Sequence, residues 1–478
     1  MQWRMFYFVQ DTWRVTPKLT LSLGIRWDTW FPNQSVNPGQ GSRYDVTTNN
    51  FVIAGIGGNS KSAGVTTEWK NFSPRFSIAY QVTPKMVVRT GWGRSFFQEI
   101  FGNSFNNTAN GYPTFITQTL SQVNPATPLF TFAQGPPSIS LPTVPQNGLM
   151  QLPDRIGATY RPKDLRYSYV DSWNFSFERL IGKDTTVTAS YVGNVGRHLR
   201  IGWALNQAIP GPGALNPRRP LFVKYGLTQG ISDASNMANN LYQALQTKLT
   251  KRFSNDLSML VTYTWSKSLD YAGGLMMNGR LNRGIADFDR AHVFTMGHNY
   301  TLPFGPGKKY FSSASGVGRR IAEGWEFSGV SLVNSGLAIT PTLVSNAAIN
   351  SDVSGVSLRP DRVTGVDPYD VAGGQSRNQW FNLGAYRVPG LYQFGTASRG
   401  QLRGPGLVEL NYSLSKRFGL GEAKSLQLRW EVFNAINRTN LANPNTAIDS
   451  GAAAAARITG LVVTGTMRQM QLGARIEF

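Results

Sequence analysis

The chain ends in a twelve-residue stretch, from Met467 to Phe478, in which side chains alternate between apolar and polar from Met470 up to the final residue. Every second residue from Met470 to Phe478 is apolar, and the residues between them are Gln, Gly, Arg and Glu. Because successive side chains leave a strand on opposite faces, this period of two predicts a β-strand with one apolar face. The alternative is an edge strand of a soluble sheet, although the ends of soluble chains usually fray into polar residues.

The same alternation recurs along the chain, mostly in pairs of segments joined by short turns. In the segment 19–27, for example, Leu, Leu, Leu, Ile and Trp alternate with Thr, Ser, Gly and Arg. The predicted strands are Met5–Val15, Leu19–Trp27, Pro74–Val82, Met86–Arg94, Ser172–Leu180, Thr186–Val192, Leu245–Phe253, Leu257–Trp265, His292–Leu302, Trp325–Val333, Val408–Phe418, Leu426–Val432 and Met467–Phe478.

The other connections are long and rich in Gly, Pro, Asn and Ser, which marks them as loops. They cover residues 31–70, 97–165, 196–240, 270–290, 336–406 and 437–466. So many long loops count against a compact soluble domain. Outer-membrane barrels, in contrast, combine short periplasmic turns with long extracellular loops. The sequence therefore predicts an all-β fold, an antiparallel transmembrane β-barrel of the bacterial outer membrane, with these six segments outside the cell.

The number of strands bears on how much of a barrel the chain forms. We count about 13 strands, whereas single-chain bacterial barrels have an even number and both termini at the periplasm. We therefore expect the chain to be the C-terminal part of a larger barrel. On its own, it is expected to form an open or imperfectly closed sheet whose first strand lacks its natural partner.

Composition excludes several classes of protein. No run approaches the ~20 consecutive apolar residues of a spanning helix, so a helical membrane protein is excluded. The chain has no Cys, which excludes disulfides and Cys-ligated metals. Its formal charge of +21 could suggest nucleic acid, but Lys and Arg are spread singly along strands and loops. We expect them to line an aqueous lumen and the loops, with lipopolysaccharide phosphates as an additional partner and no nucleic acid.

No arrangement of residues predicts catalysis or metal binding. His292 and His298 share one strand face but lie about 20 Å apart along it, too far to ligate one metal. Asp287 and Asp289, next to Arg290, could form a carboxylate pair but are more typical of turn and salt-bridge contacts. We expect no enzyme activity, no metal and no cofactor.

Tryptophans fall within or at the ends of the predicted strands. The indole ring favours the headgroup level of a bilayer, where its apolar face meets lipid and its N–H meets water. Core packing in a soluble sandwich is the alternative. The candidate membrane-interface residues are Trp13, Trp27, Trp92, Trp173, Trp265 and Trp430.

The strand-forming segments together resemble the TonB-dependent outer-membrane receptors, particularly the Oar-like group with a carboxypeptidase-regulatory-like domain. The stretches that carry the resemblance include YFVQDTWRVTPKLTLSLGIRWD, NFSPRFSIAYQVTPKMVVRTGWG, YQALQTKLTKRFSNDLSMLVTYTWSKSLD, LQLRWEVFNAINRTNLANPN and MRQMQLGARIEF. This family implies a barrel of about 22 strands with a plugged lumen. It also implies contact with the TonB complex through an N-terminal part that this sequence does not contain.

The end of the chain resembles the C-terminal signal that the barrel-assembly machinery recognises in outer-membrane proteins. The matching residues are Gln471, Gly473, Ile476 and Phe478. We expect Phe478 to matter for assembly and Glu477 not to matter.

Two functions from different classes follow from this prediction. The first is a receptor that imports a scarce, bulky nutrient such as a siderophore, cobalamin, oligosaccharide or peptide, which loops such as 97–165 and 336–406 capture outside. The second is a surface binding or adhesion protein that uses the barrel as an anchor. A soluble basic β protein remains a third possibility at the level of sequence. The residues that bind the ligand are unknown at this level.

Overall fold

The computed structural model describes the chain except residues 1, 99–110, 117–127, 129, 137–142, 165, 234, 255, 272–281, 346–347, 352–357, 422–423 and 463–466. Within the described residues, no helix is both long enough and apolar enough to cross a bilayer.

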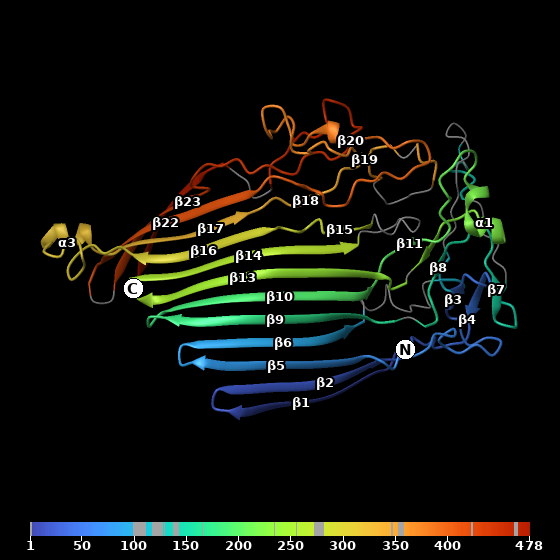
Figure 1. The fold of residues 1–478 in the computed structure, drawn as a ribbon, viewed down its shortest axis with the longest axis horizontal. Helices are drawn as coiled ribbons and strands as arrows, with labels where there is room; N and C mark the ends of the chain where they lie inside the picture. The colour runs from blue at the N-terminus through green and yellow to red at the C-terminus, as the bar shows by residue number, and fades with distance from the viewer. Residues whose placement is uncertain are drawn as a thin grey trace.

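The main element of the fold is one large antiparallel sheet in which each strand pairs with the next long strand of the chain (Figure 1). The short strand β15 (Arg283–Ile285) pairs with β14 in addition. In order across the sheet, the thirteen long strands are β1 (Arg4–Thr16), β2 (Leu19–Trp30), β5 (Phe72–Thr83), β6 (Met86–Phe97), β9 (Ser168–Ile181), β10 (Thr185–Leu199), β13 (Ala238–Ser254), β14 (Leu257–Tyr271), β16 (His292–Thr301), β17 (Trp325–Asn334), β22 (Leu407–Gly419), β23 (Ser425–Phe433) and β24 (Gln469–Glu477).

All the predicted strands are confirmed, with differences at their ends. The largest differences lie at the end of the sheet where the long connections begin, which we call the loop end. There β10 and β13 each extend seven residues beyond the predicted strand, to Leu199 and Ala238. These extensions are Gly- and Asn-containing sequences with weak alternation, and pairing of one strand with the other, as between Gly196 and Asn240, stabilises them. The short turns gather at the opposite end, which we call the turn end (Figure 1).

The pairing register brings the apolar residues of neighbouring strands together on one face. Ile25 of β2 lies opposite Val9 of β1 and Pro74 of β5, and Leu472 of β24 lies opposite Trp430 of β23. A slip of one residue would move every side chain of a strand to the other face, so the alternation in the sequence specifies this register.

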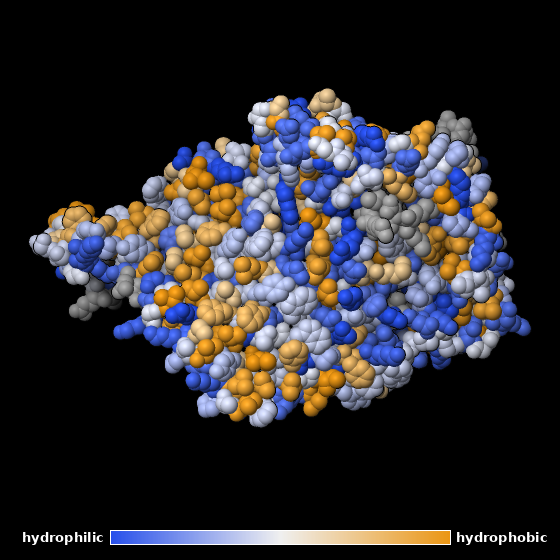
Figure 2. All heavy atoms as spheres, in the orientation of Figure 1, coloured by the Kyte–Doolittle hydropathy of each residue, from blue (hydrophilic) through white to orange (hydrophobic). Residues whose placement is uncertain are grey.

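The apolar face of the sheet is largely uncovered. Leu23 is 59% exposed, Phe76 is 45% exposed and Leu472 is 82% exposed. Figure 2 shows apolar side chains at the surface over the region of β1, β2 and β5. A soluble monomer rarely exposes an apolar surface of this extent, which indicates contact with lipid or with another protein.

The sheet is open within the described residues. The pairing order begins with β1 and ends with β24, and each of these strands has a partner on one side only. Nearly every residue of β1 is exposed. The prediction of an open sheet is confirmed.

The long connections are not irregular, which corrects the expectation that they contain only loops. Near the loop end they form a second sheet of six short strands (Figure 1), in the order β11 (Trp203–Ala204), β12 (Ile231–Asp233), β8 (Ala158–Tyr160), β3 (Ser42–Asp45), β4 (Asn50–Ile53) and β7 (Leu149–Gln151). Helix α1 (Pro220–Tyr225) contributes Leu221 to the core of this layer, where Tyr44, Phe51 and Ile231 are also buried.

Further short pairings organise the connection that follows β17, and one core joins it to the connection that follows β23. Strands β18 (Ala338–Ile339) and β21 (Leu402–Arg403) pair with each other, as do β19 (Asp361–Arg362) and β20 (Tyr386–Arg387). Phe381, Leu402 and Ala456 are fully buried in a core that joins these segments. The buried hydrophobic clusters of this protein therefore lie mainly in the connections, while the sheet leaves its apolar face bare.

One connection at the turn end is long. The glycine-rich segment between β16 and β17 carries helix α3 (Gly316–Ala322), which projects from that end of the sheet (Figure 1).

Candidate functional site

In the described part of the protein, two hollows on the polar face of the sheet stand out, and the larger of these two lies toward the loop end. It has a volume of about 710 Å³, and residues from β2, β5, β6, β9, β10 and β13 line it. Its charged residues are Arg26, Asp28, Arg75 and Arg94, and Asn194 and Tyr242 lie on its far side. The Arg26 guanidinium lies 2.5 Å from an oxygen of the Asp28 carboxylate, which is almost fully buried. This hollow is charged, and a polar ligand or polypeptide segment fits it better than an apolar one does.

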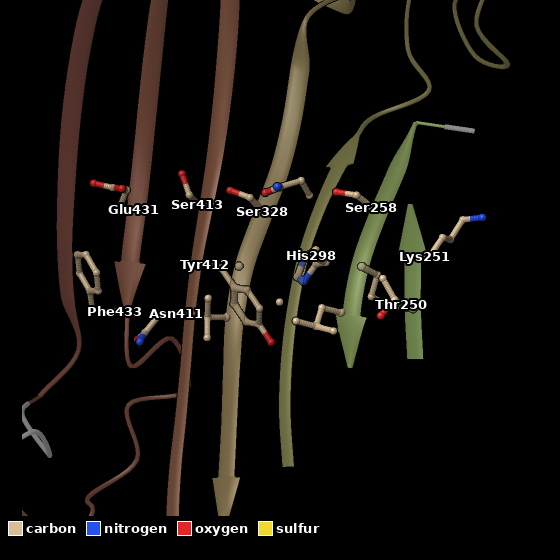
Figure 3. Close-up of a pocket in the computed structure, with 16 residues that line it drawn as sticks. Thr250, Lys251, Ser258, His298, Ser328, Asn411, Tyr412, Ser413, Glu431 and Phe433 are labelled. Atoms are coloured by element: carbon tan, nitrogen blue, oxygen red, sulfur yellow. The ribbon is translucent and has the colours of Figure 1, made fainter. Parts of the chain in front are cut away.

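The second hollow has a volume of about 530 Å³ and lies over β13, β14, β16, β17, β22 and β23. A row of polar residues crosses it, each opposite the next in the pairing register. Figure 3 labels Ser258, Ser328, Ser413 and Glu431 of this row. The full row, which continues past the hollow onto β24, is Ser258, Asn299, Ser328, Ser413, Glu431 and Gln471. Gly297 leaves open space beside the row, because a Cβ at this position would meet no atom within 4 Å. The sheet thus presents hydroxyl, amide and carboxylate groups to whatever fills the space in front of it.

On the apolar face, two glycines are each covered by an aromatic ring from the adjacent strand. A Cβ on Gly193 would lie 2.5 Å from the indole ring of Trp173, and a Cβ on Gly329 would lie 2.2 Å from the ring of Tyr412. The Tyr412 ring also contacts the ring of His298, with 6.1 Å between the ring centroids. Only glycine leaves room for these rings to lie flat across the neighbouring strand, so these glycines determine where the aromatic side chains sit.

The six candidate interface tryptophans all lie on long strands, on the apolar face that the register defines. Trp13 lies three residues from the turn end of β1, and Trp27 lies three residues from the loop end of β2. Trp92 and Trp173 lie opposite each other. Trp265 pairs with His292, and Trp430 lies in the interior of β23. The structure does not bring the six residues together, and a role at the membrane interface stays a prediction.

The four candidate assembly residues divide between the two faces of β24. Gln471 and Gly473 lie on the polar face, opposite Glu431 and Arg429. Ile476 lies on the apolar face, opposite Leu426. Phe478 follows β24 at the turn end and is 87% exposed. Their recognition by the assembly machinery stays a prediction.

Ion pairs lock two of the long connections together at the loop end. The buried Arg399 guanidinium binds the carboxylates of Asp270 and Asp287, with 3.0 Å between Nη2 and the nearer Asp287 oxygen. Arg403 donates to Asp289, whose carboxylate is 1% exposed, at 2.5 Å. The salt-bridge interpretation of Asp287 and Asp289 is therefore confirmed. Their partners, which lie more than 100 residues away in the sequence, were missed because no local pattern points to them.

Hydrogen bonds connect a third segment to the same layer. Arg218 donates from Nη1 to the carbonyl oxygen of Asn350 at 2.8 Å, and Asn350 donates to the carbonyl oxygen of Gly211 at 2.8 Å. Three connections that are far apart in the sequence thus form one hydrogen-bonded layer over the loop end. We call this layer, together with the six-stranded sheet whose strands β11 and β12 come from the same connection as Arg218, the loop layer.

Burial shifts the pKa of an arginine in this layer. Burial, followed by the charge of the neighbouring Arg399, lowers the pKa of Arg359 to about 10. Arg359 donates to the carbonyl oxygen of Ala397 at 3.2 Å, which holds its guanidinium inside the layer.

An open antiparallel sheet with one bare apolar face, one polar face and long connections at one end defines the wall of a membrane β-barrel. The family described as outer membrane beta barrel domain matches residues 1–471, and the chain belongs to this family. The protein is therefore located in the bacterial outer membrane. No curated protein matches the chain by sequence.

Three solved structures of outer-membrane proteins are among those similar to the chain. The ferripyoverdine receptor of Pseudomonas aeruginosa is 8% identical over 99% of this chain and 38% of its own, with a TM-score of 0.44. The ferric-catecholate import receptor Fiu of Escherichia coli is 10% identical over 100% of this chain and 45% of its own, with a TM-score of 0.43. The transporter YddB of Escherichia coli is 8% identical over 99% of this chain and 54% of its own, with a TM-score of 0.42. The chain thus spans about half or less of the length of these structures.

Proposed function

We propose that this chain forms the barrel wall of a TonB-dependent outer-membrane receptor, of the Oar-like group, that takes up a scarce and bulky nutrient. The observation that carries this proposal is the loop layer above a polar sheet face with two hollows. The loop layer is an ordered surface at one end of the barrel wall, and the polar face is a hydrophilic path along that wall.

The orientation follows from the lengths of the connections. Short turns face the periplasm in outer-membrane barrels and long loops face outward, which supports a position of the loop layer outside the cell on this proposal. Recognition residues are disproportionately found on loops that a rigid scaffold positions. The ion pairs of Arg399 and Arg403 make this layer a fixed surface rather than a set of independent loops. A fixed surface loses less conformational entropy when it binds a ligand.

The polar face lines the path below the loop layer. Its rows of hydroxyl, amide and charged groups are suited to a hydrated ligand or to a polypeptide that fills the lumen. On this proposal, the plug and the segment that contacts TonB lie on the N-terminal side of Met1. The coding sequence upstream of Met1 tests this directly, because an adhesion protein that uses the barrel as an anchor needs neither.

Uptake itself is tested in a deletion strain. Growth is measured on media in which one nutrient is limiting and is supplied in a single form. The forms are a ferric siderophore as the iron source, cobalamin where growth requires it, and an oligosaccharide or a peptide as the carbon source. We expect the deletion to lose growth on one nutrient class and the restored gene to recover it. Full growth of the deletion strain on every source, together with loss of attachment to surfaces, would favour the adhesion function instead.

A further inference from the structure

One arginine of the loop layer is buried, and its side chain has no partner in the part of the chain that the structure describes. Arg161 follows β8 directly and is 7% exposed. Its Nε is sealed from solvent and meets no hydrogen-bond acceptor. Among the described residues its side chain forms neither a hydrogen bond nor an ion pair.

Arg161 lies close to the place where two connections meet, the one between β6 and β9 and the one between β10 and β13. Ser168, at the start of β9, donates to the carbonyl oxygen of His198 at 2.7 Å, which joins the segment after β8 to the end of β10. Asn236, just before β13, donates from Nδ2 to the carbonyl oxygen of Arg166 at 2.9 Å. The junction of these segments is fixed by its own hydrogen bonds and needs nothing from the Arg161 side chain.

The junction is strongly basic. Segments 161–167 and 197–200 contain five basic residues, Arg161, Lys163, Arg166, Arg197 and Arg200, and one carboxylate, Asp164.

The carboxylates near the junction in the sequence have other partners. Asp164 accepts a hydrogen bond from Thr66 at 2.7 Å. Asp171 binds Arg94 through both of its oxygens, and Asp233 accepts from the backbone N–H of Ser235. Glu68 brings a further carboxylate to the junction, where it accepts the backbone N–H of Tyr167 at 2.7 Å. None of these four acids forms an ion pair with Arg161 among the described residues.

A buried charge without a counter-ion is costly, and proteins normally pair such a group or bind an ion with it. Burial, followed by the charge of Arg200, lowers the pKa of Arg161 to about 10, so the guanidinium still carries its charge at neutral pH. A guanidinium binds carboxylate or phosphate oxygens through two parallel N–H groups. The missing partner is therefore expected to be an oxyanion.

We propose that Arg161, supported by the positive charge of Arg200, is an oxyanion-binding site in the loop layer, and that it takes a carboxylate or phosphate group of a small ligand. This proposal rests on the proposed function for its biological meaning, since it gives the chemical class of the nutrient that the outer surface captures. The site itself is a property of the folded protein.

The test uses the protein as its gene encodes it, extracted from outer membranes in detergent. Thermal unfolding and titration calorimetry are measured with inorganic phosphate and with citrate, against chloride at the same ionic strength. We expect one or both oxyanions to raise the unfolding temperature of the wild-type protein. Phosphate binding alone indicates a phosphorylated ligand, and citrate binding alone indicates a carboxylate ligand.

Two substitutions and one control separate binding from structure. Arg161→Gln should weaken oxyanion binding at least tenfold. Without an oxyanion it should leave the unfolding temperature equal or higher, because an unpaired charge is removed. Arg161→Lys keeps the charge but loses the two-pronged geometry, and should bind more weakly than wild type. Arg387→Gln, at a highly exposed arginine elsewhere in the loop layer, should change neither quantity.

Three results would overturn the proposal: no binding of either oxyanion by the wild-type protein, equal binding by Arg161→Gln, or a markedly lower unfolding temperature of Arg161→Gln without any oxyanion. The last result would give Arg161 a structural role. Because binding is measured on purified protein and uptake is measured by growth, each proposal can fail without the other.

Discussion

Replacing Asp289 by Ala should release one of the contacts that hold the loop layer together. The Asp289 carboxylate is 1% exposed and lies 2.5 Å from the Arg403 guanidinium, which is 30% exposed. Its other oxygen accepts the backbone N–H of Ser268 at 2.6 Å. The substitution therefore leaves the buried N–H of Ser268 and the Nη2 group of Arg403 without their acceptor. Nη1 of Arg403 keeps its hydrogen bond to the carbonyl oxygen of residue 289 at 2.9 Å.

The magnitude follows from this burial. Removing one partner of a buried ion pair costs about 3–5 kcal/mol. Arg403 is partly exposed and can regain some hydration, so we expect the lower limit, about 3 kcal/mol. Since 1.4 kcal/mol corresponds to about a tenfold change in an equilibrium constant, the population with this contact open should rise on the order of 100-fold.

Amide hydrogen exchange of the detergent-solubilised protein measures this opening. Exchange in peptides that cover residues 283–290 and 397–406 should accelerate by about two orders of magnitude, while peptides from the interior of β13 and β14 should not change. Arg319→Ala serves as the control, because Arg319 and Glu323 form an exposed ion pair on α3 at the opposite end of the sheet. Such a pair contributes about 0–1 kcal/mol. Unchanged exchange of the two loop-layer peptides in Asp289→Ala would refute the conclusion that ion pairs lock this layer.

Two further predictions concern the sheet and its last strand. Gly193→Ala should displace the Trp173 ring, which lies 2.5 Å from the added Cβ, and should cost about 1–3 kcal/mol. Thermal unfolding measures the loss of stability, and tryptophan fluorescence measures the displacement of the ring. The control is Gly297→Ala, whose added Cβ meets open space and should leave stability nearly unchanged. Deletion of Phe478 in the full-length protein should lower the amount of heat-modifiable folded barrel in the outer membrane, and an unchanged amount would contradict the proposed assembly signal. Glu477→Gln should have little effect, because its contacts with Arg417 and Arg475 are both 3.4 Å long and lie on partly exposed side chains.

The sequence determined the large sheet because the information for it is local. A period of two in each segment specifies a strand and its faces, and a short turn specifies which strand pairs with the next. For this reason the thirteen long strands and their order could be predicted, and so could the apolar face on which Leu472 and Trp430 lie opposite each other. The strand ends at the loop end were predicted less well, because residues such as Gly196 and Asn240 pair only when the neighbouring strand is already in place.

Only the tertiary structure decided the loop layer and the candidate oxyanion site. The short strands β8 and β12 are three residues each, too short to show a period, and they pair in parallel across more than 70 residues of sequence. Arg403 and Asp289 are 114 residues apart, and no pattern near either of them identifies the other. The same holds for Arg161, since its sequence neighbours do not show whether a carboxylate faces it in the fold. Burial and charge pairing are properties of residues that meet in space, and in this protein the long connections bring those residues together.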